Sequence, residues 1–125
     1  MEAPRKIDVN DQGHLVEIFE KMVELLVETR GAYGVVTVDD PEFMQVMAFD
    51  DGGLRLESSA SDKVFAADLG FYERVEEFEH IAAANIPAGW PAKEKMVAQT
   101  MALLAVEVHD VQFPTSLEFQ LELAE

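Results

Sequence analysis

The chain has no cysteine and only nine lysines and arginines in 125 residues. The absence of cysteine excludes disulfides, thiolate metal sites and cysteine nucleophiles. The basic residues are opposed by 25 aspartates and glutamates, which leaves a formal charge of -16. Because a strongly acidic protein repels phosphate groups, this composition predicts that the chain binds neither nucleic acid nor an anionic membrane.

Long hydrophobic runs are also missing from the sequence. No apolar stretch approaches the ~18 residues of a membrane span, and the first twelve residues lack the apolar middle of a signal peptide. We therefore expect a cytoplasmic protein. Hydrophobic residues still make up 49% of the chain, too many for a disordered protein. We expect a flexible tail over residues 1–10 and a single α+β domain over residues 11–125.

The first predicted element is an amphipathic helix over residues 14–29. Asn10 or Asp11 is a suitable N-cap, and Gly31 is a suitable left-handed residue to end the helix. One wide face is apolar at helical spacing and the opposite face carries glutamates. The residues expected to pack this face on a sheet are Leu15, Ile18, Phe19, Met22, Leu25 and Leu26.

Three short segments after this helix predict an antiparallel meander. Residues 33–38 are rich in β-branched side chains, and residues 42–49 are apolar on both faces, as expected of a covered strand. Residues 50–53 read Asp-Asp-Gly-Gly, which supplies the positive φ angles of a tight hairpin turn. Residues 54–59 then alternate apolar with polar side chains, as in a half-buried strand.

Two further helices are predicted to pack on this sheet. Residues 58–63 are polar and indicate a loop, after which apolar residues return at helical spacing over residues 71–82. Residues 93–111 predict the last helix, whose middle is apolar nearly all round and so must be buried on more than one side. Residues 115–125 alternate in a way that leaves two alternatives open, an edge strand or a short amphipathic helix.

Trp90 stands between the second and last predicted helices. Its neighbours Pro87, Gly89 and Pro91 rule out regular helix there. We expect Trp90 to be a structural anchor that holds this loop by packing its ring.

The sequence carries no motif that indicates catalysis, a metal or a cofactor. No serine lies in a nucleophile-elbow context, and the phosphate-binding and dinucleotide-binding glycine motifs are absent. Glu77 and His80 have the spacing of a di-metal site, but such a site needs a second copy of the pair. The aspartates of the turns lack the spacing of a calcium loop. We therefore predict a protein that is not an enzyme and that binds no metal or cofactor.

Methionine and phenylalanine are the more suggestive residue types. Because methionine is flexible and polarizable, a methionine-rich surface can adapt to varied apolar partners. Most of these side chains are explained by a core between sheet and helices, but some are expected to meet a second chain or a peptide. The candidate partner-binding residues are Phe43, Met44, Met47, Phe49 and Met101.

The order of these segments resembles the type III secretion chaperone-like superfamily, and most closely its actinobacterial peptide-binding-chaperone-like branch, related to the YbjN-type regulators. The resemblance rests on an aromatic-rich second strand, the Asp-Gly-Gly turn, the Gly89-Trp90 pair and a last helix followed by residues 111–114 (VQFP). It implies an α+β domain that binds an extended segment of a partner protein. One departure stands out: that family has five strands, with the last two after the second helix, whereas residues 86–111 of this sequence predict a loop and a helix.

Two functions remain open from the sequence. The first is a chaperone-like or adaptor module that holds an extended apolar peptide along the sheet or a strand edge. The second is an acidic regulatory or immunity-type protein that blocks a basic partner surface. We also expect a homodimer, because three predicted helices are too few to cover both faces of a three-stranded sheet and to surround the last helix.

Overall fold

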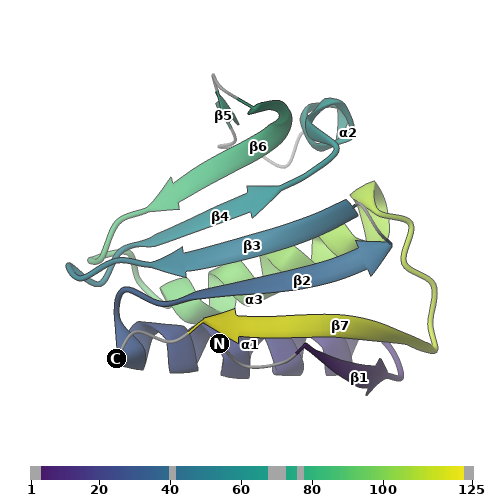
Figure 1. Cartoon of the computed structure of the whole chain (residues 1–125), viewed down its shortest axis with the longest axis horizontal. Helices are drawn as coiled ribbons and strands as arrows, with labels where there is room; N and C mark the ends of the chain where they lie inside the picture. The colour runs from purple at the N-terminus through teal and green to yellow at the C-terminus, as the bar shows by residue number, and fades with distance from the viewer. Residues whose placement is uncertain (1–3, 40–41, 68–72, 76–77, 123–125) are drawn as a thin grey trace.

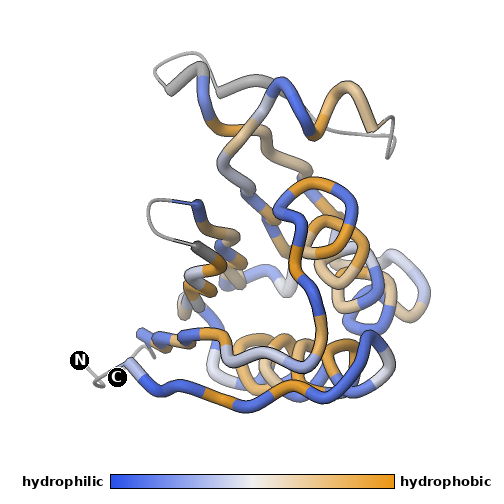
Figure 2. The backbone as a smooth tube through the Cα atoms, turned by 90° about the vertical axis from the view of Figure 1, so that its right-hand side faces the viewer, coloured by the Kyte–Doolittle hydropathy of each residue, from blue (hydrophilic) through white to orange (hydrophobic). Residues whose placement is uncertain are grey.

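The computed structural model describes residues 4–39, 42–67, 73–75 and 78–122. The elements in chain order are β1 (Arg5–Val9), α1 (Gln12–Thr29), β2 (Tyr33–Asp39), β3 (Glu42–Ala48), β4 (Leu54–Ser58), α2 (Ser61–Ala66), β5 (Glu73–Val75), β6 (Phe78–Ile86), α3 (Lys93–Leu103), the π-helical turn η1 (Leu104–Val108) and β7 (Thr115–Glu122). Within this part of the chain the strands form one antiparallel sheet in the order β1-β7-β2-β3-β4-β6-β5. The two long helices, α1 and α3, lie on one side of the central strands (Figures 1 and 2). The predicted α+β class is confirmed.

α1 begins and ends as its sequence predicts. The backbone of Asp11 is extended, and its carboxylate accepts a hydrogen bond from the His14 backbone N–H at 2.8 Å, so Asp11 caps the helix. Beyond the last turn, Gly31 has a φ of 73°, the left-handed conformation that glycine adopts without a steric penalty.

The buried face of α1 differs from the predicted one at Leu25. Leu25 is 39% exposed, so its assignment to the core stripe is wrong, and Ile18 is only partly buried. Leu25 lies beside a hollow on the flank of α1 that no side chain fills. The side chains that bury the helix are Leu15, Phe19, Met22, Val23 and Leu26.

The predicted meander is present as β2, β3 and β4. β3 pairs with β2 on one side and with β4 on the other. The turn into β4 closes with a hydrogen bond from the Phe49 N–H to the Gly53 carbonyl at 2.9 Å. Gly52 supplies the positive φ, 91°, and the Asp51 carboxylate accepts the Gly53 N–H at 2.7 Å. The Asp-Gly-Gly signal is therefore read correctly as a hairpin turn.

β6 takes the place of a predicted helix. The helix expected over residues 71–82 is wrong for the described part of that range, where residues 73–75 and 78–86 are strands; Phe71 lies outside the described residues. Ala82, Ala84 and Ile86 are buried opposite three residues of β4. Their spacing of two residues fits a strand, but three alanines in a row obscure the alternation.

Both ends of the described chain join the sheet. Residues 5–9 form β1, so they are not the flexible tail expected there. β7 settles the open alternative for residues 115–122 as a strand, and it is interior, because it pairs with β1 on one side and with β2 on the other. Asp8 and Ser116, which are hydrogen-bonded, are 108 positions apart in the sequence. Local sequence patterns therefore could not predict that β1 and β7 pair.

The last helix is covered within the chain itself. The expected single helix over residues 93–111 is α3 followed by η1, and the polar segment expected as a loop contains the start of α2. α3 packs against α1, and the residues at its apolar middle, Met101, Leu104 and Ala105, are fully buried. The seven-stranded sheet and α1 together bury the last helix, which the predicted three-stranded sheet could not do. No helix among the described residues is long and apolar enough to cross a membrane.

Candidate functional site

The sheet has a covered face, against which α1 and α3 pack, and an open face turned toward the viewer in Figure 1. Successive side chains of a strand point to opposite faces. Along β3, Met44, Val46 and Ala48 are buried on the covered face, whereas Phe43 and Met47 are partly exposed on the open face. No helix crosses β2, β3 or β4 on the open side in Figure 1.

An apolar strip runs along β2 and β3 on this open face. The register places Tyr33 opposite Met47, Val35 opposite Gln45 and Thr37 opposite Phe43. Side chains directly opposite each other on an antiparallel pair are in contact range. The strip continues to Phe49, which is 42% exposed and lines a small hollow with Tyr33 and Met47. Tyr33 was missed from the sequence, although it shares its strand face with Val35 and Thr37.

Two of the predicted partner-binding residues do not lie on this surface. Met44 and Met101 have no exposed surface. Met44 faces the covered side because it is three residues, an odd number, from Met47 on the same strand. Met101 lies on α3, which packs against α1. Their assignment to partner binding is therefore wrong, and they belong to the core.

Polar side chains border the apolar strip on its β4 side. The Arg55 guanidinium donates to the Glu57 carboxylate at 3.1 Å and to the Asn85 side-chain oxygen at 3.2 Å. All three residues belong to the open face by their register. Gln45 and Thr37 lie among the apolar residues of the strip, and Glu118 and Gln120 of β7 border it on the β2 side. Apolar residues with a polar border are the usual anatomy of a protein–protein interface.

Trp90 is more exposed than an anchoring role predicts. Its side chain is 48% exposed, and it borders a small hollow of about 60 Å³ with Ile86 and Met96. Its backbone N–H donates to the Pro87 carbonyl at 3.0 Å. The turn is therefore closed by a backbone hydrogen bond, and the ring is only partly packed.

A buried serine and a buried histidine meet a partly exposed glutamate on the covered side. The Ser58 hydroxyl lies 2.9 Å from Nε2 of His109, and Nδ1 of His109 lies 3.6 Å from Oε1 of Glu42. The sequence gives no signal for this cluster, because the three residues come from β4, η1's end and the start of β3. Burial lowers the pKa of His109, and the nearby Glu42 carboxylate opposes that shift.

The Ser58–His109–Glu42 cluster is placed for packing and not for attack on a substrate. Ser58 has no exposed surface, and its hydroxyl donates to the Ser59 carbonyl at 3.0 Å. The hydroxyl then accepts from Nε2 of His109, which leaves Nδ1 without a hydrogen-bond partner. A nucleophile needs an accessible oxygen whose proton goes to the base.

Other candidate chemistry is sparse in the described residues. No group of three or more histidine, aspartate or glutamate side chains there is arranged to hold a metal ion. Comparison of the chain with protein-family models, curated proteins and solved structures gives no match.

Proposed function

We propose that the chain is a non-catalytic module that binds an extended apolar segment of another protein across the open face of the sheet. The observation that carries the proposal is the apolar strip of Tyr33, Val35, Phe43, Met47 and Phe49, which no element of the described chain covers. Aromatic and methionine side chains are enriched at protein interfaces, and the two methylene groups and sulfur of Met47 can adapt to different side chains.

The order of elements supports the same proposal. The superfamily that the sequence resembles has a helix, three strands, a second helix, two strands and a last helix. The chain has α1, then β2, β3 and β4, then α2, then β5 and β6, then α3. The two strands that the sequence interpretation lacked after the second helix are therefore present, as β5 and β6. β1 and β7 extend this order at both ends.

A second copy of the chain is the alternative occupant of the open face. The original reason for a homodimer, an uncovered last helix, no longer applies, because α3 and η1 are buried by α1 and the sheet. A homodimer held by apolar contacts would now use the open face. The two occupants are separated by measuring the oligomeric state before any peptide is added.

The test is a selection of binding peptides from a random display library, followed by affinity measurements on variants. Met47→Glu places a charge between Tyr33 and Phe49 on the strip, and Gln99→Glu, at an exposed position of α3 on the other side of the sheet, is the control. We expect apolar peptides whose affinity falls about tenfold or more with Met47→Glu, as for a central interface contact, and stays within about twofold with Gln99→Glu.

Salt dependence separates this function from the acidic one. Apolar capture keeps its affinity as ionic strength rises, whereas blocking of a basic surface through the charge of -16 weakens steeply. Selected peptides that are basic, insensitive to Met47→Glu and released by salt would overturn the proposal in favour of an acidic inhibitor.

A further inference from the structure

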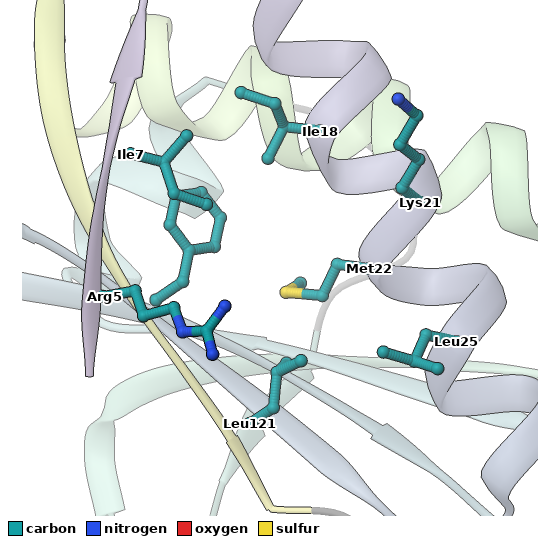
Figure 3. Close-up of a pocket in the computed structure, with 8 residues that line it drawn as sticks. Arg5, Ile7, Ile18, Lys21, Met22, Leu25 and Leu121 are labelled. Atoms are coloured by element: carbon teal, nitrogen blue, oxygen red, sulfur yellow. The ribbon is translucent and has the colours of Figure 1, made fainter. Parts of the chain in front are cut away.

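A second hollow lies on the covered side of the sheet, between α1 and the paired strands β1 and β7. Its volume is about 330 Å³, at the small end of the range for ligand pockets, roughly 300–1,000 Å³. Figure 3 shows the side chains around it. Its lining includes four apolar side chains and two cations: Ile7, Met22, Leu25, Leu121, Arg5 and Lys21.

The hollow is bordered by the described part of β1, by β7 and by α1. Arg5 of β1 lies opposite Phe119 of β7, and Leu121 is two residues further along β7. Leu121 lies opposite Gly34 of β2, where a Cβ would come within 3.0 Å of Leu121 and 3.1 Å of Met22. The missing side chain of Gly34 leaves room for both to line the floor. Leu25 then has nothing opposite it, which accounts for its exposure.

The two polar residues of the hollow are both cations. Arg5 extends from β1 and its guanidinium points into the space in front of Met22 and Leu121, while Lys21 stands on the rim with its ammonium group directed away (Figure 3). Neither cation forms an ion pair with any described residue. This is unusual in a chain with 25 acidic residues and nine basic ones.

An apolar hollow with an unpaired arginine selects a ligand that is apolar along its length and anionic at one end. The planar guanidinium matches the two oxygens of a carboxylate. Most of the protein surface is acidic and repels anions. Arg5 makes the mouth of the hollow locally positive, so that it complements a carboxylate. The alkyl chain would lie against Ile7, Met22 and Leu25, whose contacts favour burial of methylene groups.

We propose that this hollow binds an aliphatic monocarboxylate, a medium-chain fatty acid, with its carboxylate on Arg5. The site lies on the face of the sheet opposite the apolar strip proposed for protein binding, so the two proposals stand or fall separately. It also gives a role to Leu25 and Arg5, two residues that neither the core nor the open face uses.

Calorimetric titration of the full chain with decanoate, below the concentration at which decanoate self-associates, tests the proposal. Arg5→Gln removes the charge that points into the hollow, and Lys6→Gln removes the same charge from the next residue, which the strand register places on the open face. We expect saturable binding at one site, weakened about tenfold by Arg5→Gln, as for loss of a charge-assisted hydrogen bond. Lys6→Gln should change the affinity less than about twofold, as for a screened surface charge.

A second pair of variants tests the apolar part of the site. Leu25→Asp places an anion in the hollow, and Leu103→Asp is its matched control, since both leucines are 39% exposed on long helices. Leu25→Asp should abolish decanoate binding and Leu103→Asp should preserve it. Decanol, with the same chain and no charge, should bind more weakly than decanoate.

The outcomes that overturn the proposal are equally specific. The first is the absence of saturable decanoate binding to the intact chain. The second is equal weakening by Arg5→Gln and Lys6→Gln, which would reduce the effect to net charge. The third is decanol binding as tightly as decanoate, which would make the hollow a general apolar cleft.

Discussion

Met44 and Met47 lie on the same strand, three residues apart, and face opposite sides of the sheet. Met44 has no exposed surface, whereas Met47 is partly exposed in the apolar strip. Both methionines were predicted to bind a partner, but side chains an odd number of residues apart on a strand face opposite sides of the sheet. Truncating each side chain should therefore change the free energy of unfolding by a different amount.

Met44→Ala should lower the free energy of unfolding by about 2–5 kcal/mol, because it leaves a cavity in the core. Met47→Ala should lower it by less than about 1 kcal/mol, as for a partly exposed site. Urea denaturation of both variants measures the difference. Equal losses would place both methionines in the core and remove Met47 from the proposed interface.

His109 makes the stability of the fold depend on pH. Burial lowers its pKa in the folded state from the ordinary value of 6.5, so the unfolded chain takes up the proton first as the pH falls. The stabilising contribution of neutral His109 is complete above pH 6.5 and is lost below it, as the pH falls toward the lowered pKa. Glu42 and Asp110 oppose the shift and Lys63 adds to it.

The effect of His109 is isolated by comparison with His109→Gln. We expect the free energy of unfolding of the wild type to fall more steeply than that of the variant when the pH drops below 6.5. Chemical denaturation at a series of pH values measures both slopes. A wild type that gains stability relative to the variant on acidification would mean that Glu42 outweighs burial and that the pKa is raised.

At the scale of elements, the segments with strong local signals are the ones that sequence reasoning predicts. α1 has a cap, a wide apolar stripe and Gly31, and the β3–β4 turn has two glycines. β1, β6 and β7 are different. β6 is rich in alanine, which favours helix and is depleted in strands, and its pairing with β4 and β5 makes it a strand. β1 and β7 pair with each other across most of the chain.

The candidate site was predictable to the same extent. Phe43, Met47 and Phe49 follow from the aromatic and methionine content of β3, and all three are accessible. Met44 and Met101 were misplaced because a strand that is apolar on both faces does not reveal which face is covered. The hollow beside Leu25 forms between α1 and the paired strands β1 and β7, and Ser58, His109 and Glu42 meet only through the fold.

The pairing of β1 with β7 predicts the effect of removing residues 1–9. A flexible tail would be dispensable, but Val9 is fully buried and Ile7 packs against the core. Burial of one such side chain contributes about 1.5–3 kcal/mol. We expect the truncated chain to unfold at a clearly lower urea concentration, with a free energy of unfolding at least about 2 kcal/mol smaller. Unchanged stability would show that β1 does not form in solution.

At the scale of the whole molecule, charge and the open face act against each other. Two copies of the chain bring together a charge of -32, twice -16, so self-association should strengthen with salt. The polar border formed by Arg55 and Glu57 can stay at the rim of such a contact.

Analytical ultracentrifugation at low and moderate salt, with and without Met47→Glu, tests association through the open face. Occupation of the open face by a second copy predicts a dimer that is favoured by salt and lost in the variant. A monomer near 13.9 kDa under all conditions leaves the apolar strip to a peptide from another protein. A dimer that survives Met47→Glu would place the contact elsewhere.

The interior position of β7 also has a consequence for biosynthesis. β2 is made early, but the strand that pairs with its second edge is Thr115–Glu122, the last described segment of the chain. A growing polypeptide on the ribosome can form α1 and the meander and still present the unpaired backbone of β2 to its surroundings. The sheet closes only when β7 has been made and inserts between β1 and β2.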